Sequence, residues 1–216
     1  MEYRPPDLPL EILHADDALL VLNKPSGLLS VPGRGEGKQD CLASRVQAIY
    51  PEALTVHRLD MSTSGLIVMA RGAEMQRKLN ALFEGRQVEK RYVAIVAGKL
   101  EKDAGEIDLP MITDWPNRPR QMIDHERGKP SLTRYRVLAY DAAQDRSRVA
   151  LEPFTGRSHQ LRLHMHSIGH PILGDELYGT AETLAAAPRL LLHAEWLRFP
   201  HPGTGDTIAF CAPPPF

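Results

Sequence analysis

A polar loop that runs into an apolar segment carries the residues best suited to chemistry. The stretch Thr55–Ala70 reads TVHRLDMSTSGLIVMA, and Asp60 is the only carboxylate between Glu52 and Glu74. A short loop joined to a buried strand holds a reactive group rigidly, so Asp60 could serve as a nucleophile. A carboxylate in a turn also commonly caps its own loop, and the residue types alone leave both roles open.

A second stretch offers a cation for that carboxylate. In TGRSHQLR, Thr155–Arg162, the apolar spacing predicts a helix on which Arg162 shares a polar face with His159 and His166. A guanidinium opposite a carboxylate keeps it ionised and fixes its orientation. Arg162 is therefore a candidate partner for Asp60 if the fold places the two residues opposite each other.

Two patterns that could suggest a bound cofactor or metal both fail on spacing. The glycine-rich Pro32–Lys38, PGRGEGK, lacks the first glycine of a Walker loop and is followed by Gln39 instead of Ser or Thr. A cluster of histidines includes no H-E-x-x-H and has no cysteine or carboxylate nearby to complete a zinc site; its members are His159, His164, His166 and His170. The sequence therefore predicts neither a metal nor a cofactor, and a polar helix face or contacts to RNA explain these histidines better.

The composition is that of an ordinary globular protein. A chain of 216 residues can form one hydrophobic core without disulfides, and we expect a single domain over residues 1–216. The cysteines, Cys41 and Cys211, form no C-x-x-C pair, which is typical of a reduced chain. The start, MEYRPPDLPL, is too polar for a signal peptide, and no apolar run reaches the length of about 18 residues that a membrane span needs. These features predict a cytoplasmic location and no membrane partner.

Charge is distributed unevenly along the chain. The net charge of −1 by itself argues against a nucleic-acid binder. Between Trp115 and Arg136, however, there are six basic and two acidic residues, and Phe154–Gly174 holds two arginines and four histidines without an acid. The acidic residues gather elsewhere, so the fold could present one basic face to a nucleic acid. Solvated charges scattered over the surface are the alternative explanation.

Short strands outnumber helices in the pattern of apolar residues. In Thr133–Ala139 apolar and polar positions alternate, which is typical of a half-buried strand in an antiparallel sheet. The other apolar runs predict further strands, and the full set is Ala18–Asn23, Leu66–Ala70, Tyr92–Ala97, Thr133–Tyr140, Arg148–Leu151, Leu190–Phe199 and Thr207–Phe210.

Three helices are expected between these strands. Helical spacing predicts one over Ala73–Glu84 and another that starts after Ser158 as its N-cap and stops at Gly169. A third is expected over Cys41–Tyr50. Because strands and helices do not alternate regularly, the sequence predicts an α+β fold with a mixed, largely antiparallel sheet.

Six motifs in a fixed order resemble those of the RluA family of pseudouridine synthases. The resemblance extends over almost the whole chain, whereas HRLD alone could occur by chance. The motifs are NKPSGLLSVP (Asn23–Pro32), HRLDMSTSGL (His57–Leu66), KRYVA (Lys90–Ala94), GKPSLTRY (Gly128–Tyr135), TGRSHQLRLH (Thr155–His164) and GHPILGDELYG (Gly169–Gly179). One small departure is Ser131, where the family commonly has alanine, and it affects no catalytic residue.

The resemblance implies the fold, the reaction and the catalytic residues. We expect a pseudouridine synthase fold, with a bent, mostly antiparallel mixed sheet, flanking helices and a central basic cleft. Such enzymes isomerise uridine to pseudouridine within RNA, and no redox cofactor is needed because no electrons are gained or lost. The family's catalytic aspartate falls on Asp60, its ion-pair partner on Arg162, and its active-site tyrosine on Tyr92. Without the resemblance, Tyr92 could equally be an aromatic residue of the core.

The resemblance also implies the RNA contacts and the substrates. Arg58 could fill the gap that a flipped base leaves, and Arg157 could hold a phosphate. The full set of predicted RNA-binding residues is His57, Arg58, Arg118, Arg120, Arg157 and His159. In its motif DWPNRP (Asp114–Pro119) and in the expected absence of an S4-type RNA-binding domain, the chain resembles family members that modify both a 23S rRNA loop and a tRNA anticodon stem-loop. We expect a monomer.

Two other classes of protein would use part of the same residues. A hydrolase of nucleosides or glycosides would use Asp60 but needs a second carboxylate as acid or base, and none stands out in these motifs. A noncatalytic RNA-binding module would keep the basic stretches and Tyr92 without needing Asp60 or Arg162. Whether Asp60 attacks the sugar or the base stays open at this point, because both routes need the same carboxylate.

Overall fold

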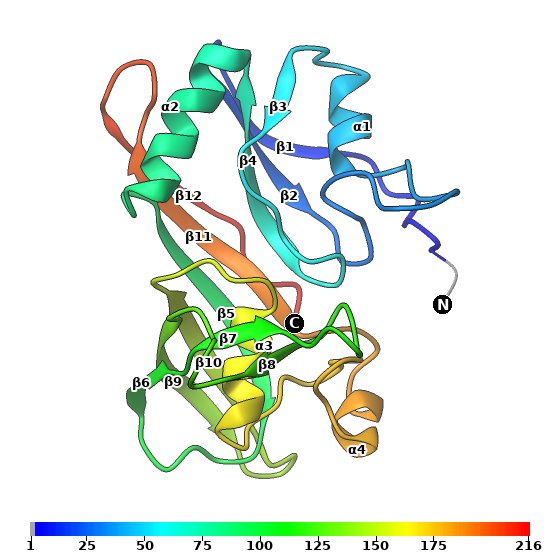
Figure 1. The fold of residues 1–216 in the computed structure, drawn as a ribbon, viewed down its shortest axis with the longest axis vertical. Helices are drawn as coiled ribbons and strands as arrows, with labels where there is room; N and C mark the ends of the chain where they lie inside the picture. The colour runs from blue at the N-terminus through cyan, green and yellow to red at the C-terminus, as the bar shows by residue number, and fades with distance from the viewer. Residues whose placement is uncertain (1–2) are drawn as a thin grey trace. The chain divides into compact units, whose positions relative to one another are not determined.

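The computed structural model describes residues 3–216, which form two compact units (Figure 1). The first unit covers the described residues up to Lys90 together with His193–Pro215, and the second covers Arg91–Leu192 together with Phe216. Each unit combines a mainly antiparallel sheet with helices, which confirms the predicted α+β class. None of the helices within residues 3–216 is long and apolar enough to cross a membrane.

The sheet of the first unit has the strand order β1-β2-β4-β11. Strand β4 pairs in parallel with β11 through residues 64 and 65 at its start, and antiparallel with β3 through residues 69–71 at its end. Strand β12 continues the sheet beyond β11. The elements of this unit are β1 (Glu11–Ala15), β2 (Leu19–Lys24), α1 (Leu42–Gln47), β3 (Ala53–Thr55), β4 (Ser64–Arg71), α2 (Ala73–Glu84), β11 (Leu192–Pro200) and β12 (Thr207–Cys211).

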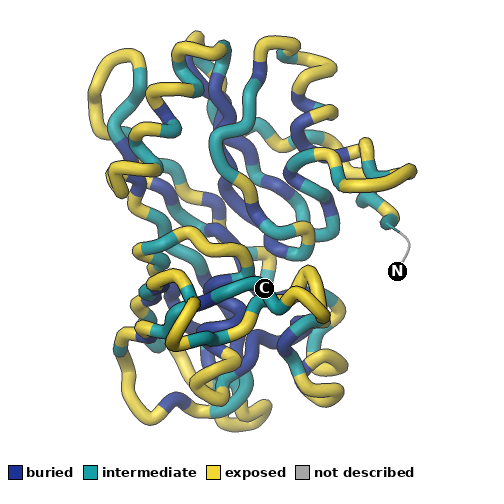
Figure 2. Tube along the Cα trace, viewed as in Figure 1, coloured by how far each residue is buried: buried dark blue, intermediate teal, exposed yellow. Residues whose placement is uncertain are grey.

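The apolar segments of two strands, β2 and β4, make the centre of this sheet. Residues 19–22 of β2 and 66–70 of β4 are fully buried (Figure 2), as expected for strands that are covered on both faces. Helix α2 packs onto them with Leu79, supported by the half-buried Met75 and Phe83. Its bounds agree with the helix predicted from the spacing of these residues, because burial of one apolar stripe is what stabilises a surface helix.

The sheet of the second unit has the antiparallel order β5-β10-β9-β6. Strands β7 and β8 form a separate two-stranded hairpin. The elements of this unit are β5 (Glu89–Ala97, with its first two residues in the first unit), β6 (Ala104–Asp108), β7 (Met111–Thr113), β8 (Gln121–Ile123), β9 (Leu132–Asp141), β10 (Arg146–Pro153), α3 (Gln160–Ser167) and α4 (Ala181–Ala185).

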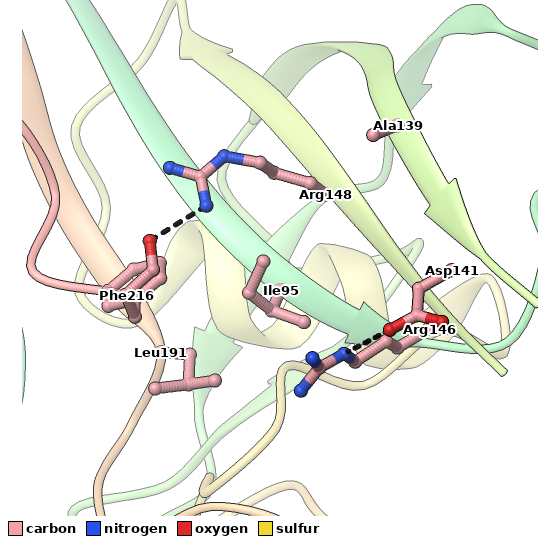
Figure 3. A pocket seen from close by; sticks show the side chains of 7 residues that line it. All are labelled: Ile95, Ala139, Asp141, Arg146, Arg148, Leu191 and Phe216. Atoms are coloured by element: carbon pink, nitrogen blue, oxygen red, sulfur yellow. Dashed lines mark hydrogen bonds and ion pairs between the residues drawn. The ribbon is translucent and has the colours of Figure 1, made fainter. Parts of the chain in front are cut away.

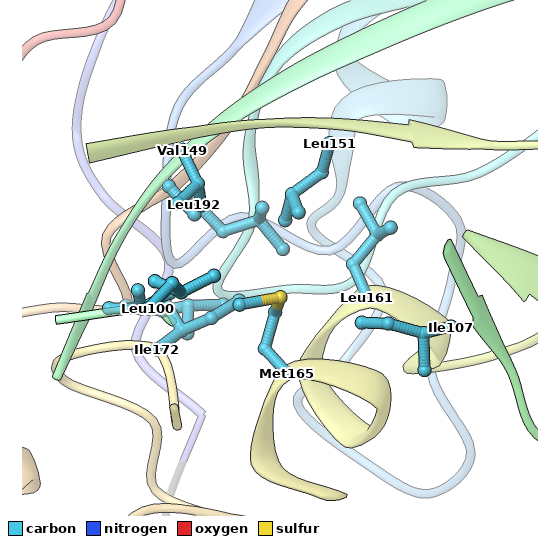
Figure 4. Close-up of a cluster of buried hydrophobic side chains, with 11 residues drawn as sticks. Leu100, Ile107, Val149, Leu151, Leu161, Met165, Ile172 and Leu192 are labelled. Atoms are coloured by element: carbon cyan, nitrogen blue, oxygen red, sulfur yellow. The ribbon is translucent and has the colours of Figure 1, made fainter. Parts of the chain in front are cut away.

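The core of the second unit forms where α3 covers strands β5 and β10 (Figure 4). Leu161 and Met165 of the helix pack with Val149 and Leu151 of β10. On β9 burial alternates from residue 133 to 138, as the sequence pattern predicts, and the pairing with β10 then shifts by one residue. Such a bulge bends the strand and re-aims the side chains beyond it.

Helix α3 departs from the sequence prediction at its start and is more deeply buried than its polar residues suggest. Ser158 is not the N-cap: His159 takes that position in a left-handed conformation, with φ 55°, and its side chain makes no capping bond. The helix ends before Gly169 (φ 85°), so the predicted stop is confirmed. The predicted common face of His159, Arg162 and His166 is confirmed, because all three side chains lie beside the ring of Tyr178. This face is not open to solvent at Arg162, which is buried together with the rest of Leu161–Met165. A helical segment that is buried all round, as residues 160–165 are, shows no simple periodicity in its sequence.

The remaining differences concern short elements. Helix α1 is shorter than predicted and begins after Cys41, whose sulfur accepts a hydrogen bond from the N–H of Ser44. Strands β1, β3, β6, β7 and β8 and helix α4 were not predicted. Elements of three to five residues contain too few positions for a period to be recognised.

Gly65 allows β4 and β11 to approach each other. Its φ is +113°, and a Cβ added there would overlap the backbone of Ala194. We expect Gly65→Ala to lower the free energy of unfolding by about 3 kcal/mol or more, because backbone atoms cannot move aside. Gly205, with φ +83° and nothing within 4 Å of an added Cβ, is the matched control, and its Ala variant should cost about 1 kcal/mol. Urea titrations of both variants test this, and equal losses would contradict it.

Candidate functional site

The loop that carries Asp60 is held through the main chain on either side of it. The hydroxyl of Ser30 donates to the carbonyl of Leu59 at 2.7 Å and accepts from the N–H of the same residue at 3.1 Å. The hydroxyl of Ser26 donates to the carbonyl of Ser62 at 2.7 Å. Because both flanks are fixed, the loop backbone cannot drift, and the half-buried Asp60 side chain leaves it from a defined position.

A buried lysine completes this attachment. Lys24, the last residue of β2, is fully buried, and its Nζ donates to the carbonyls of Pro25, Leu28 and Met61 at 2.9, 2.7 and 3.1 Å. The N–H of Gly27 donates to the same carbonyl of Met61 at 2.8 Å. A buried ammonium must have its N–H groups satisfied, so Lys24 ties the end of β2 to the residue that follows Asp60.

His57, at the start of the same loop, is packed inside the first unit. Its Nε2 accepts the N–H of Val68 at 2.9 Å, and its ring stacks on Phe83 with centroids 4.6 Å apart. Desolvation of the packed ring, and to a smaller extent the charge of Lys90, lowers the pKa of His57 to about 3. The imidazole is therefore neutral at pH 7 and anchors the loop, whereas the neighbouring Arg58 is exposed.

In the second unit, one glutamine organises the turn before α3. The side-chain oxygen of Gln160 accepts from the hydroxyl of Thr155 at 2.7 Å and from the N–H of Arg157 at 3.1 Å. Its amide nitrogen donates to the carbonyl of Leu132 and to Thr133 Oγ1, both at 3.0 Å. The exposed guanidinium of Arg157 is thus carried on a turn that β9 holds in place.

Arg162 forms a buried two-pronged ion pair with Asp175. Its Nε and Nη2 donate to the two carboxylate oxygens at 2.8 and 2.6 Å, and the side chains are 4% and 0% exposed. Burial alone would raise the pKa of Asp175, but Arg162 and the N–H groups of Leu177 and Tyr178 outweigh it, so this pKa lies below its ordinary value. The pair fixes the orientation of the Arg162 guanidinium.

Tyr178 connects three of the predicted site residues. Its hydroxyl accepts the N–H of Gln121 at 2.8 Å and shares a hydrogen bond with Nδ1 of His159 at 3.0 Å. The guanidinium groups of Arg120 and Arg162 each lie 5.5 Å from the centre of its ring. The β7–β8 hairpin, the start of α3 and the buried ion pair therefore share one aromatic side chain.

The other two predicted residues of this unit differ in their surroundings. Tyr92 lies opposite Leu151 in the pairing of β5 with β10 and is half-buried against the core. Arg118 is exposed in the loop between β7 and β8, where its guanidinium lies 4.4 Å from the centre of the Trp115 ring.

A surface pocket of the second unit contains none of the predicted residues (Figure 3). It lies between β5, β9 and β10, and Arg148 donates there to the main-chain oxygen of Phe216 at 2.7 Å. Arg146 pairs with Asp141 on its other side at 3.3 Å.

The predicted site residues fall into two groups, each organised within its own unit. The first unit carries His57, Arg58 and Asp60, and the second carries Tyr92, Arg118, Arg120, Arg157, His159 and Arg162. The expected pairing of Asp60 with Arg162 involves both units and stays a prediction. Sequence reasoning missed the supporting residues, although each lies inside a recognised motif; these are Lys24, Ser30, Asp175 and Tyr178.

The buried pair makes a prediction about stability. Asp175→Asn removes the carboxylate that binds both Nε and Nη2 of the buried Arg162, so we expect the free energy of unfolding at pH 7 to fall by about 3 to 5 kcal/mol. Because the folded-state pKa of Asp175 is lowered, its contribution is fully present above about pH 4 and is lost as the pH falls further. The gap between wild type and variant should therefore shrink in acid.

Urea titrations at pH 7 and at pH 3 measure this difference. The control is Glu74→Gln, which removes an exposed pair with Lys78 and should cost less than about 1 kcal/mol. A gap that is independent of pH, or equal losses in the two variants, would contradict the assignment.

Comparison with known proteins identifies the family of this chain. Residues 18–167 match the family model described as RNA pseudouridylate synthase. The chain is 53% identical over 215 residues to the dual-specificity RNA pseudouridine synthase RluA of Escherichia coli strain K12, covering 99% of this chain and 98% of that protein. It is also 53% identical over 217 residues to the protein of the same name from Pasteurella multocida strain Pm70, covering 100% and 99%.

Solved structures give the same answer for the fold. Human RNA pseudouridylate synthase domain containing 1 matches with a TM-score of 0.80 and 32% identity, over 96% of this chain and 84% of that one. Human RNA pseudouridylate synthase domain containing 4 matches with a TM-score of 0.75 and 26% identity, over 95% and 88%. The solved structures confirm the predicted pseudouridine synthase fold. The family model and the relatives confirm the predicted isomerisation of uridine in RNA. The chain belongs to the RNA pseudouridine synthases of the RluA type.

Proposed function

We propose that Asp60 is the nucleophile of the reaction, that Arg162 keeps it ionised and oriented, and that Tyr92 stacks on the target uracil. One observation carries the assignment of Asp60: its loop is fixed on both flanks by Ser30 and Ser26 and tied down by the buried Lys24. A nucleophile needs such a fixed position, because small displacements of reacting groups cost large factors in rate.

The proposed reaction conserves atoms and electrons. The bond from C1′ to N1 of uridine breaks, the uracil turns, and a bond from C1′ to C5 forms. The C5 proton leaves, and N1 gains one, so the product has the mass of the substrate. Asp60 adds to the sugar or to the base and is released at the end, while Tyr92 helps to remove the C5 proton. No oxidant, reductant or metal is required for this balance.

The buried ion pair supports the proposed role of Arg162, which is to orient the Asp60 carboxylate and favour its ionised form. Its guanidinium is held by Asp175 through two short hydrogen bonds and cannot rotate without breaking them. A cation fixed in this way can favour the ionised form of a second carboxylate. The two units would then act together as one catalytic domain over residues 1–216, with Asp60 supplied by the first and Arg162 by the second.

We further propose that this enzyme has two RNA substrates, a 23S rRNA loop and a tRNA anticodon stem-loop. Support comes from the dual-specificity relatives, which match over their whole length, and from the motif DWPNRP. His57, Arg58, Arg118, Arg120, Arg157 and His159 would contact the RNA. We expect the enzyme to act as a cytoplasmic monomer.

The first test of this proposal replaces the nucleophile. Asp60→Asn keeps the size of the side chain but is a far poorer nucleophile, so we expect pseudouridine formation to fall by at least about a thousandfold with RNA affinity unchanged. Turnover is measured by nucleoside analysis of a stem-loop RNA. Asp17→Asn, an exposed aspartate of the same unit, is the control and should keep full activity. Turnover of Asp60→Asn within about tenfold of wild type would rule out this role.

The second test concerns the state of the target uridine. Its C1′ and C5 are not both accessible while the base is stacked, so the base must be flipped out, which costs a few kcal/mol and least in a loop. We expect turnover of an anticodon stem-loop and none of the same sequence locked in a duplex. We propose that Arg58 fills the gap left by the flipped base. Equal turnover rates on the loop RNA and the duplex RNA would contradict base flipping as the source of selectivity. Release of free uracil during the reaction would instead indicate a hydrolase.

A further inference from the structure

Trp115 is the most exposed of the large hydrophobic residues in the described part of the chain. It lies in the loop between β7 and β8, with 66% of its surface accessible. Residues 115–120 are all exposed (Figure 2). Neither catalysis by Asp60 nor the core of either unit accounts for a tryptophan in this position, since a ring of this size normally contributes through burial.

The loop holds this tryptophan in a defined place. The N–H of Asp114 donates to the carbonyl of Arg120 at 3.0 Å, and the N–H of Arg120 donates to the carbonyl of Asn117 at 3.0 Å. The side-chain amide of Asn117 donates to both carboxylate oxygens of Asp114, at 3.1 and 2.9 Å. The one acidic group of the loop is thus used inside it, and the ring stands on a closed, hydrogen-bonded turn.

One face of the ring is occupied and the other is accessible. The guanidinium of Arg118 lies 4.4 Å from the ring centre, which is within cation–π range. A ring that is covered on one face and still 66% exposed must present its other face to solvent. Arg118 lies against the ring and Arg120 belongs to the same exposed loop, so the surface of this loop combines an aromatic face with cations. Sites that bind single-stranded nucleic acid have this combination.

We infer that the free face of Trp115 is a stacking platform for an unpaired base of the RNA substrate, at a nucleotide other than the target uridine. This inference rests on the proposed function, because it takes RNA as the partner. Tyr178 joins the hairpin to the start of α3, since its hydroxyl bonds both the N–H of Gln121 and the ring of His159. The platform is therefore fixed to the turn that carries Arg157, where a phosphate contact is proposed.

Stacking should appear as a coupling between one side chain and one base. We expect Trp115→Ala to weaken binding of a stem-loop RNA, raising the dissociation constant by roughly 5- to 150-fold. Trp115→Phe keeps an aromatic face and should recover most of this loss. The steepness of the salt dependence should not change in either variant, because no charge is removed. Leu184→Ala, which trims another exposed apolar side chain of the second unit, is the matched control and should bind as wild type.

The position of the base is found with abasic substitutions. Each loop nucleotide of the RNA is replaced in turn by an abasic ribose, and binding is measured for wild type and for Trp115→Ala. At the stacked nucleotide the abasic RNA should weaken wild type but leave Trp115→Ala unaffected, which is the signature of a direct contact. Protein fluorescence gives a second readout: binding should quench wild type more than Trp115→Phe, which keeps Trp196.

Three outcomes would overturn the inference. The first is binding by Trp115→Ala within twofold of wild type, and the second is the absence of coupling at every loop position. The third is loss of self-association in Trp115→Ala, seen by sedimentation, with RNA binding intact, which would make the surface a protein contact. The test of the catalytic role of Asp60 is separate, because it is read from turnover and not from binding. We expect Asp60→Asn to lose turnover but to keep the coupling and the quenching. Full turnover in this variant would contradict the role of Asp60 without affecting the stacking inference.

Discussion

The ammonium group of Lys24 is buried at the end of β2, and moving such a charge out of water costs several kcal/mol. The main-chain carbonyls of Pro25, Leu28 and Met61 offset this cost by surrounding Nζ. Two of these carbonyls belong to the segment after β2 and one to the loop of Asp60. If that loop moved away, the lysine would lose a partner in a place that water does not reach. The interaction therefore makes the position of the Asp60 loop part of the stability of the fold.

The second unit uses the same principle with a different pair of groups. Arg162 and Asp175 are both buried, and such a pair contributes less to stability than its short distances suggest, because both charges lose their hydration. The pair instead fixes the orientation of the Arg162 guanidinium. Two parallel hydrogen bonds and the neighbouring ring of Tyr178 leave the guanidinium one arrangement. A reaction that depends on a charge at a fixed place benefits from this more than from a larger apolar core.

The sequence predicts long periodic elements well and local exceptions poorly. Helix α2 has an apolar stripe, and its bounds, Ala73–Glu84, could be read from it. Residues 160–165 of helix α3 are all buried and the helix starts from a left-handed His159, and neither property has a periodic signal. The strands of the β7–β8 hairpin are three residues long and are too short to be recognised. For the site, the motifs indicated Asp60 and Arg162, but not that Arg162 binds Asp175, because a pairing partner depends on tertiary contacts that residue spacing does not encode.

The division of the chain between the two units also governs the order in which they can form during translation. The second unit is nearly continuous in sequence, whereas the first needs β11 and β12, which follow Lys90 only after roughly a hundred further residues. At about 5 to 20 residues per second, the ribosome delivers these strands about 5 to 20 seconds after the end of the first segment. During that interval β4 has neither its parallel neighbour nor the His193 ring that bonds Ser64. The part of the β4 edge that β3 does not cover then stands open, and we expect the nascent chain to be most prone to wrong strand pairing at this edge until β11 emerges.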